Sequence, residues 1–535
     1  MKKTLIKLVA LLLTLALTLS GCSGGGLLDM INDFWVSMQN GMITHFEDME
    51  YTRPDMDGFR KLLEDTMAEI PEAKDVDELM ESVFALYEFY YEFDTSYQLA
   101  NIHYCQDMTD LYWDEEYSWC MANSSEVTAG MDKLLYALAD CDLREELEVE
   151  KYFGEGFFDS YEGDSLWDET FTELMNQENA LVDQYYDLTA KLESDTAATE
   201  MDYVGQIEAV FANLVKVRQD IAEYAGYESY PDFAYEFYFY RDYSAADTLA
   251  YLEQIQEELV PLYLKLDSSV WTPYYQNCSE TQTFNYVKEC AQAMGGVAKN
   301  AFNLLEMAGL YDITYSEKKY PASFEVYLLS YYAPFIFVNP MGNQTDKMSF
   351  THEFGHFCND YAVGGSVVGI DVAEVFSQGL EYLSLSYCKD TKALTKMKMA
   401  DSLCIFVEQA AYAKFELDVY MLEEVTVENV RKAFAGAMND FGMSQWGIGS
   451  QDYIQVPHFF LSSMYVISYV VSNDVAMQIY QAELAETGAG VELWENGLYS
   501  MEAGLLAFVE ETGLKNPFEE GRVTEIRKTF EEKLK

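Results

Sequence analysis

Residues 352–356 read His-Glu-Phe-Gly-His, two histidines separated by three residues with a glutamate directly after the first. On a helix, His352 and His356 lie about 40° apart around the axis and one turn along it, so their rings can bind one metal ion. Glu353 lies at the same edge, where its carboxylate can reach a water molecule at that ion. The chain has only five histidines, which makes the pairing informative. The pattern predicts a zinc site of the metallopeptidase type.

The residues around this motif predict how its helix packs. Phe350, Phe354, Phe357 and Tyr361 recur at helical spacing on the face opposite the two histidines, which indicates a core helix. Gly355 lowers helix stability by about 1 kcal/mol relative to alanine, a cost that is understandable if a neighbouring backbone approaches closely there.

A hydrolytic zinc ion needs a third protein ligand and one open position. Residues 371–381 place polar side chains on one face of a second helix, namely Asp371, Glu374, Ser377, Gln378 and Glu381. We predict Glu374 as the ligand and Glu381 as its rival, because about 10 Å of helix separates them and one ion cannot reach both. Asp371 is predicted to fix the tautomer of a liganding histidine, and Glu381 to brace a histidine if it is not the ligand. The alternative is a solvated acidic face.

A further group of candidate residues lies about 100 residues downstream. If a helix begins at Pro457, a favoured first-turn position, then His458, Tyr465 and Tyr469 fall close to one line along it. Such side chains can donate hydrogen bonds to the oxyanion that forms when water attacks a peptide carbonyl. Tyr465 and Tyr469 are rival donors. Because the chain has 42 tyrosines, packing is the alternative role for each of them.

These blocks, in this order, resemble the thimet oligopeptidase and oligoendopeptidase F family of zinc metallopeptidases. The similarity covers about residues 205–515 and includes Phe335-Ile336-Phe337-Val338-Asn339, Gly342, 351–356, 371–381 and 457–469. It implies a mainly α fold, a two-lobed helical clam shell with a deep channel, a small β-sheet beside the zinc helix, and cleavage of short peptides. It also implies one Zn²⁺ per chain bound by His352, His356 and Glu374, with Glu353 as general base and His458 with a downstream tyrosine as oxyanion donors. We expect the strand Phe335, Ile336, Phe337, Val338 and Asn339 to align the substrate by adding its backbone as an extra strand.

The sequence departs from the family pattern in three places. The stretch from His356 to Glu374 is several residues shorter than in the family, and residues 320–327 replace a glycine-rich segment. The spacing after His458 differs by one residue, which keeps the choice between Tyr465 and Tyr469 open.

The amino terminus predicts the location of the protein. Lys2, Lys3 and Lys7 precede an apolar run at residues 8–19 that ends in Leu-Ser-Gly-Cys22, which resembles a lipoprotein signal. We therefore predict a signal peptide at 1–21, a lipid-anchored Cys22 with a flexible tether at 22–26, an N-terminal helical region at 27–200 and a catalytic region at 201–535. The mature protein is expected to be exported and held on the outer face of a membrane.

The composition of the chain limits the kinds of molecule that the protein can bind. The formal charge of −59 excludes nucleic acid as a partner, because phosphates would repel the protein. Eight cysteines follow Cys22 at irregular spacings, and we assign no disulfide pairs. Amphipathic periodicity predicts helices at 59–85, 169–192, 204–224, 245–266 and 430–440, with strand character mainly at 327–338.

We therefore predict a zinc-dependent endopeptidase for short peptides. One alternative is a peptidyl dipeptidase of the same fold that recognises a free carboxylate. Another is a peptide-binding lipoprotein without catalysis, which the glutamate between two intact histidines makes less favourable.

Overall fold

The computed structural model of the chain describes residues 44–149, 152–154, 156–161, 166, 168–194, 200–365, 368–389 and 391–535. The predicted signal peptide, lipid-anchored cysteine and tether lie outside these residues. Within the described ranges, no helix has both the length and the apolar character needed to span a membrane.

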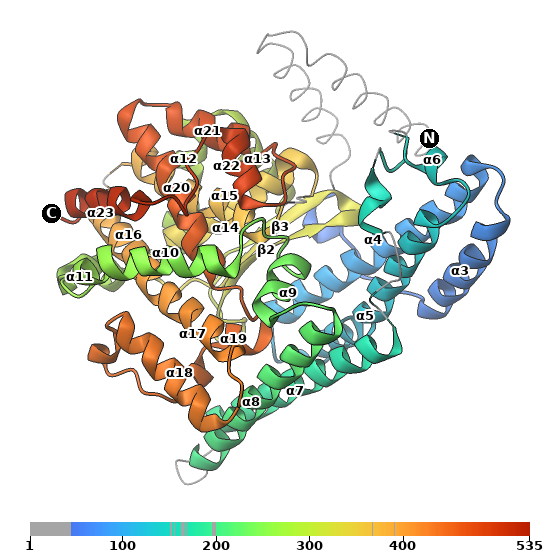
Figure 1. The fold of residues 1–535 in the computed structure, drawn as a ribbon. Coiled ribbons are helices and arrows are strands. Elements are labelled where there is room, and N and C mark those ends of the chain that lie inside the picture. Colours follow the sequence, from blue (N-terminus) through green and yellow to red (C-terminus); the bar gives the residue numbers. More distant parts are fainter. Residues whose placement is uncertain are drawn as a thin grey trace.

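The fold is mainly helical, as predicted, with one small sheet (Figure 1). The first helices are α3 (Met56–Glu69), α4 (Val76–Gln106), α5 (Leu111–Ala139), α6 (Arg144–Leu147), α7 (Glu169–Ser194), α8 (Glu200–Tyr224), α9 (Tyr230–Phe237), α10 (Ala245–Glu258) and α11 (Val260–Tyr263). The middle helices are α12 (Glu280–Met294), α13 (Gly296–Ala308), α14 (Asp346–Val363), α15 (Ile370–Tyr387), α16 (Lys392–Cys404) and α17 (Ala410–Tyr420). The last are α18 (Val427–Asp440), α19 (Pro457–Leu461), α20 (Ile467–Ala485), α21 (Ala489–Gly497), α22 (Leu505–Thr512) and α23 (Arg522–Lys533).

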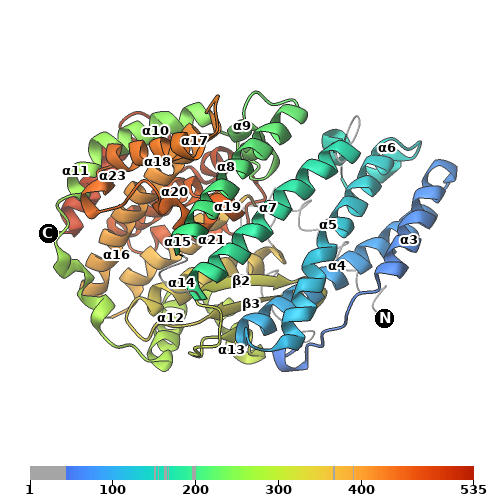
Figure 2. The same cartoon turned by 90° about the horizontal axis from the view of Figure 1, so that it is seen from below.

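Two hydrophobic clusters divide the molecule. The smaller one is formed by α3, α4, α5 and the residues just after α5, and it lies at one end of the molecule in Figures 1 and 2. The larger one runs through α14, α15 and α20 and also takes in α7 and α8. These two clusters are consistent with a two-lobed molecule, while the boundary at residue 200 stays a prediction.

The sheet has three strands in the order β1-β3-β2: β1 (Tyr311–Asp312), β2 (Ser323–Leu328) and β3 (Ala333–Val338). β3 pairs in parallel with β1 and antiparallel with β2, and all six of its residues are buried. The predicted strand at 327–338 is therefore wrong as one element. The chain turns between β2 and β3, where Tyr332 adopts a φ of 50°.

The helix with the two histidines crosses a second helix at close range, as the sequence predicts. α14 places Phe350, Phe354 and Phe357 in the core, each at most 1% exposed. At Gly355, a Cβ would lie 2.7 Å from the carbonyl oxygen of Phe376 and closer still to Ser377 Cα, both on α15. Only glycine permits this separation of α14 and α15.

Three predicted helices match α7, α8 and α18, but two others are interrupted by proline. Pro71 separates α3 from α4 within the predicted 59–85 helix, and Asp75 then caps α4 by accepting from the backbone N–H of Asp77 and Glu78. Pro261 similarly lies in the first turn of α11, which begins at Val260 after α10 has ended at Glu258. Proline lacks the N–H that an unbroken helix requires at these positions.

The predicted helix from Pro457 through Tyr469 is also wrong. α19 ends at Leu461, and α20 begins only at Ile467. Between them Met464 has a φ of 67°, in the left-handed region. The residues His458, Tyr465 and Tyr469 therefore come from two helix ends and a turn.

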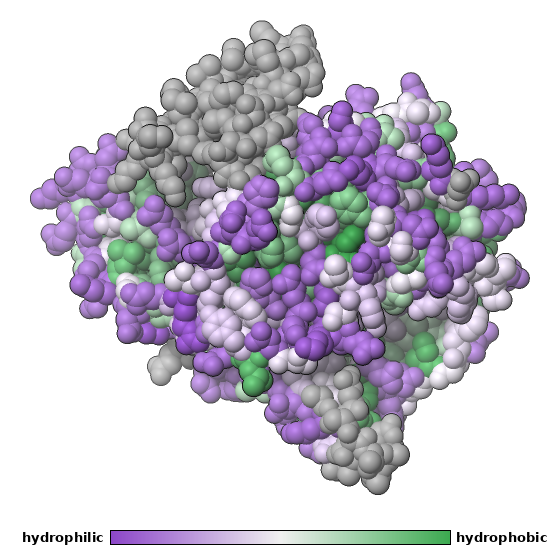
Figure 3. Space-filling model, turned by 180° about the vertical axis from the view of Figure 1, so that it is seen from behind, coloured by the Kyte–Doolittle hydropathy of each residue, from purple (hydrophilic) through white to green (hydrophobic). Residues whose placement is uncertain are grey.

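Polar residues cover most of the face seen in Figure 3, with apolar residues scattered among them. The eight cysteines after Cys22 are all described, and each is a free thiol.

The crossing at Gly355 leads to a stability prediction. Gly355→Ala should destabilise the protein by about 1–3 kcal/mol, because the added methyl group overlaps the backbone of α15. The matched control is Gly436→Ala in α18, where a Cβ meets nothing within 4 Å and alanine should stabilise by about 0.5–1 kcal/mol. Denaturant unfolding measures both changes, and equal effects of the two substitutions would contradict the close crossing.

Candidate active site

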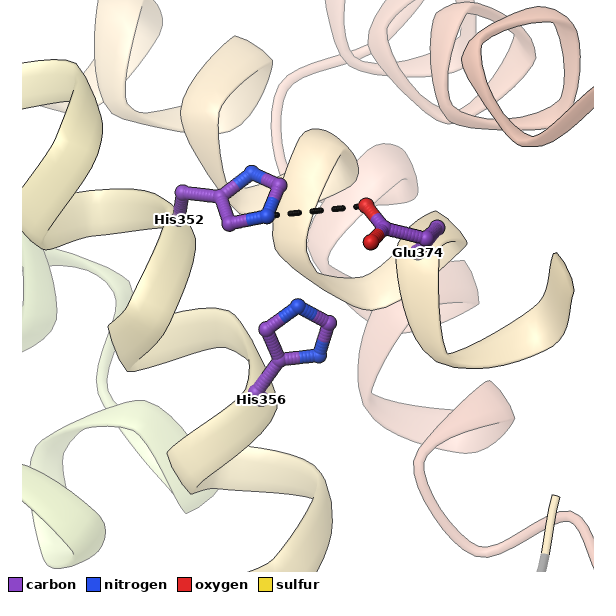
Figure 4. Close-up of side chains that lie close together, drawn as sticks. All are labelled: His352, His356 and Glu374. Carbon is purple, nitrogen blue, oxygen red and sulfur yellow. Dashed lines mark ion pairs between the residues drawn. The ribbon is translucent and has the colours of Figure 1, made fainter. Parts of the chain in front are cut away.

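His352 and His356 project from α14 toward Glu374 on α15 (Figure 4). His352 Nε2 lies 3.5 Å from Glu374 Oε2, and one donor atom from each of the three residues lies within 4.8 Å of the others. Two donors that bind one zinc ion at about 2.0–2.1 Å can be at most about 4.2 Å apart. The set therefore fits one such ion after small side-chain rotations, and two imidazoles with one carboxylate suit zinc chemically.

Both glutamates of α15 are held by further polar groups. Glu381 Oε1 accepts a hydrogen bond from His352 Nδ1 at 2.9 Å, and Glu381 Oε2 pairs with the buried Lys398 Nζ at 2.7 Å. Glu374 Oε2 accepts a hydrogen bond from the Ser377 hydroxyl at 3.2 Å. The structure thus places Glu374 beside the two histidines and Glu381 against the Nδ1 side of the His352 ring, while the role of Glu374 as a metal ligand stays a prediction.

The charges of this group shift its pKa values. Burial opposes the charge of His352, but the charge of Glu374 and the hydrogen bond to Glu381 outweigh it and raise the pKa to about 9. Burial lowers the pKa of His356 to about 4. Burial raises the pKa of Glu353 to about 7, with Glu374 and Glu381 adding to the effect against the opposing charge of His352. A histidine that binds a metal ion does so through an unprotonated ring nitrogen, so a metal ion at this site would compete with the proton of His352.

Asp371 has a different role from the one we predicted. Its carboxylate pairs with Arg241 Nε at 3.2 Å and accepts a hydrogen bond from the Tyr243 hydroxyl at 2.7 Å. The prediction that it fixes the tautomer of a liganding histidine is wrong, because its oxygens face the segment between α9 and α10.

His458, Tyr465 and Tyr469 do come together, although not along one helix. Their ring centroids lie 5.2–5.9 Å apart, and the Tyr465 hydroxyl donates to Glu374 Oε1 over 3.2 Å. Burial and the charge of Glu374 raise the pKa of both tyrosines well above the ordinary value, so both hydroxyls keep their protons. Burial lowers the pKa of His458. The cluster therefore offers neutral hydrogen-bond donors beside the predicted metal ligands.

The predicted substrate strand cannot accept a peptide along its length. β3, which contains Phe335, Ile336, Phe337 and Val338, lies between β1 and β2. Asn339 is engaged as well, because its amide donates to the carbonyl oxygens of Ser316 and Lys319. Among the described residues, β1 and β2 are the two edge strands of the sheet, and β2 is the longer, with six residues against two in β1.

Sequence reasoning missed the buried cations around the site. Lys398 lies 1% exposed behind Glu381, and Arg241 lies 8% exposed beside Asp371. Arg241 follows four aromatic residues at 237–240, whereas Lys398 lies between two methionines with Lys396 and Asp401 close by, in a chain with 33 basic and 92 acidic residues. The aromatic run was therefore an available signal for Arg241 alone, since a buried cation requires an acidic partner.

Comparison with known proteins agrees with this architecture. Residues 46–165 match the family model described as Peptidase M3 N-terminal domain. A protein from Bacillus anthracis strain Ames, assigned as an oligoendopeptidase F, has 21% identity and a TM-score of 0.75, with 92% of this chain and 98% of that chain covered. Pz peptidase A with an inhibitor has 18% identity and a TM-score of 0.77, with 91% of this chain and 99% of that chain covered.

A more distant match is Trypanosoma cruzi metallocarboxypeptidase 1, with 14% identity and a TM-score of 0.54, covering 90% of this chain and all (100%) of that chain. The comparison with curated proteins gives no significant match. The fold is thus that of the oligoendopeptidases, and the resemblance read from the sequence is confirmed.

The two α15 glutamates can be distinguished by metal binding. Glu374→Ala should abolish stoichiometric zinc binding, because it removes one of three donors. Glu381→Ala should retain zinc with about 10- to 100-fold weaker affinity, because it removes only the group behind His352. Metal analysis and calorimetric titration of both purified variants measure this. The reverse order would move the ligand assignment to Glu381.

Proposed function

We propose that this chain, which has the oligoendopeptidase F fold and matches the Peptidase M3 N-terminal domain over residues 46–165, is a zinc-dependent endopeptidase that hydrolyses short peptides. The observation that carries the proposal is the convergence of His352, His356 and Glu374 with Glu353 on the same helix edge. A site built only for peptide binding would not need a carboxylate beside three metal donors.

The bound zinc ion would supply Lewis acidity, which activates water and polarises the scissile carbonyl. Glu353 accepts a proton from the attacking water and passes it to the leaving amine. A buried carboxyl group whose pKa is raised by its surroundings is suited to take and return a proton. Its burial keeps bulk water from competing for that proton.

We assign stabilisation of the oxyanion to the cluster of His458, Tyr465 and Tyr469, which lies beside the predicted metal ligands. Burial keeps both phenols protonated, and it favours the neutral imidazole, which still has one N–H to donate. Tyr465 is the stronger candidate, since its hydroxyl already contacts a predicted metal ligand. Donors fixed before the reaction stabilise developing charge without reorganisation.

The substrate backbone is proposed to pair with the open edge of β2 instead of with β3. β2 residues are half-buried, unlike the fully buried β3, and β2 contacts the same helix α14 that provides the two histidines. Pairing through main-chain groups fixes the direction of a peptide without requiring particular side chains. A peptide must be extended to pair in this way, which favours short, unfolded substrates in a channel between the lobes.

The location proposed for the enzyme is the outer face of a membrane, held by lipid on Cys22. The support is the basic and apolar pattern of residues 1–22 in the sequence. Signal removal would leave the peptidase on a short glycine-rich tether.

The role of Glu353 predicts a variant that binds metal but turns over slowly. Glu353→Gln should keep stoichiometric zinc and lower kcat roughly 100- to 10,000-fold, because the amide cannot accept the proton of the attacking water. Hydrolysis of a mixed peptide pool, followed by mass spectrometry with and without a chelator, measures the loss and shows whether cuts are internal. Wild-type turnover in this variant, or chelator-resistant hydrolysis, would contradict the mechanism.

The lipid anchor is testable by metabolic labelling. In a bacterial host that processes lipoproteins, the wild-type protein should incorporate an alkyne fatty acid and sediment with membranes, whereas Cys22→Ala should not incorporate it. Cys105→Ala, which removes a buried thiol, is the matched control and should keep the label. Label that persists without Cys22 would refute the anchor.

A further inference from the structure

The turn that links α19 to α20 joins two of the proposed oxyanion donors. His458 lies in α19, and Tyr465 follows the turn directly. Met464, immediately before Tyr465, is 1% exposed and has a φ of 67°. A residue other than glycine keeps this conformation only where its surroundings impose it, and such positions cluster at functional sites.

One set of contacts imposes this conformation through the carbonyl group of Met464. Arg241 donates to the Met464 carbonyl oxygen at 2.9 Å and to the Ser468 hydroxyl at 2.8 Å. Its guanidinium carbon lies 4.4 Å from the ring centroids of both Tyr235 and Phe239. Besides its contacts with the turn, Arg241 is therefore fixed by two aromatic rings and by its ion pair with Asp371 of α15.

The other set of contacts holds the amide of the same residue. Met464 N–H donates to Glu416 Oε1 at 2.6 Å, and Glu416 of α17 is 1% exposed. Burial raises the pKa of Glu416 to about 8, against the lowering effect of its hydrogen bond from the Met464 N–H. The N–H and the carbonyl group of Met464 are thus held from opposite sides, which fixes both of its backbone dihedral angles.

The His458 end of the segment is held in a similar way. Arg218, which is 1% exposed, donates to the carbonyl oxygens of Phe459 at 2.8 Å and Phe460 at 2.6 Å, and it pairs with Glu178. Each end of the stretch from His458 to Tyr465 is therefore bound by a buried arginine, Arg218 at one end and Arg241 at the other. Both arginines precede α14 and α15 in the chain.

We infer that Arg241 and Glu416 are positioning residues that hold Met464 in its left-handed conformation and so direct the Tyr465 hydroxyl toward Glu374. The inference rests on the proposed function for its catalytic consequence. Arg241 also contacts Asp371, one turn before Glu374 on α15, so the same side chain fixes the donor turn relative to the helix that carries the third ligand. The position from which the Tyr465 hydroxyl can donate a hydrogen bond is then set by the contacts of Arg241 and Glu416 with Met464.

The kinetic test compares two buried arginines. In Arg241→Lys a single ammonium group replaces a guanidinium that donates to Met464 O, Ser468 and Asp371 at once. We therefore expect kcat to fall roughly 10- to 100-fold with little change in KM. Arg522→Lys is the matched control, because Arg522 is also buried and pairs with Asp474 of α20 without contacting the turn. The control should keep wild-type kcat even if its melting temperature falls. Equal kcat losses in the two variants would overturn the inference.

A double variant tests whether Arg241 acts through Tyr465. Arg241→Lys combined with Tyr465→Phe should be no slower than Tyr465→Phe alone, because the donor that Arg241 directs is already missing. Multiplicative losses would overturn the inference. If Arg241→Lys does not fold, Glu416→Gln and Glu416→Leu make the same comparison. Glutamine keeps an acceptor for the Met464 N–H and should retain activity, whereas leucine removes it and should lower kcat.

Hydrogen exchange of the chelator-treated protein provides a readout that does not depend on activity. Peptides covering residues 459–468 should exchange slowly in the wild type and in Arg522→Lys, and faster in Arg241→Lys. Unchanged exchange in Arg241→Lys would refute the positioning role. If the wild type hydrolyses no peptide, the proposed function fails, while the exchange result still decides whether the turn is held as described.

Discussion

The close crossing of α14 and α15 at Gly355 is the constraint on which the candidate site depends. The backbone of α15 approaches so closely that no side chain fits at this position. His356 directly follows the glycine, and Glu374 lies one turn before the point of contact on α15. The short separation of the helices therefore places a carboxylate within reach of both histidines, and a wider crossing would carry Glu374 away from them.

Buried ionic groups surround this crossing and define its geometry further. Lys398 neutralises Glu381 behind His352, and Arg241 neutralises Asp371 beside the turn before Tyr465. Each acid of α15 that is not a predicted ligand thus has its own cation. Among the described residues, Glu374 pairs with no lysine or arginine; its neighbours are the His352 ring at 3.5 Å and hydroxyl and amide groups. The charge pattern distinguishes the predicted ligand from its two acidic neighbours on the same helix.

Much of this site could be predicted from sequence because its parts are local. The histidine spacing, the apolar back of α14 and the cost of Gly355 are properties of one helix, and the structure agrees with each. The errors concern backbone breaks and distant partners. Pro71 and Pro261 interrupt two helices that hydrophobic periodicity predicts as continuous. The turn at Met464 contains no glycine, so the sequence gives no sign of its left-handed conformation. The partners of Asp371 come from residues 241 and 243, and β3 lies inside the sheet, so neither could be seen from local spacing.

The central claim is that one metal ion is held where α14 and α15 cross. Anomalous X-ray diffraction at the zinc absorption edge, from crystals grown with zinc, tests it most directly. We predict a single strong peak bounded by His352 Nε2, a ring nitrogen of His356 and a carboxylate oxygen of Glu374. A peak at Glu381 or Asp371, or the absence of a peak between the two helices, would contradict the claim.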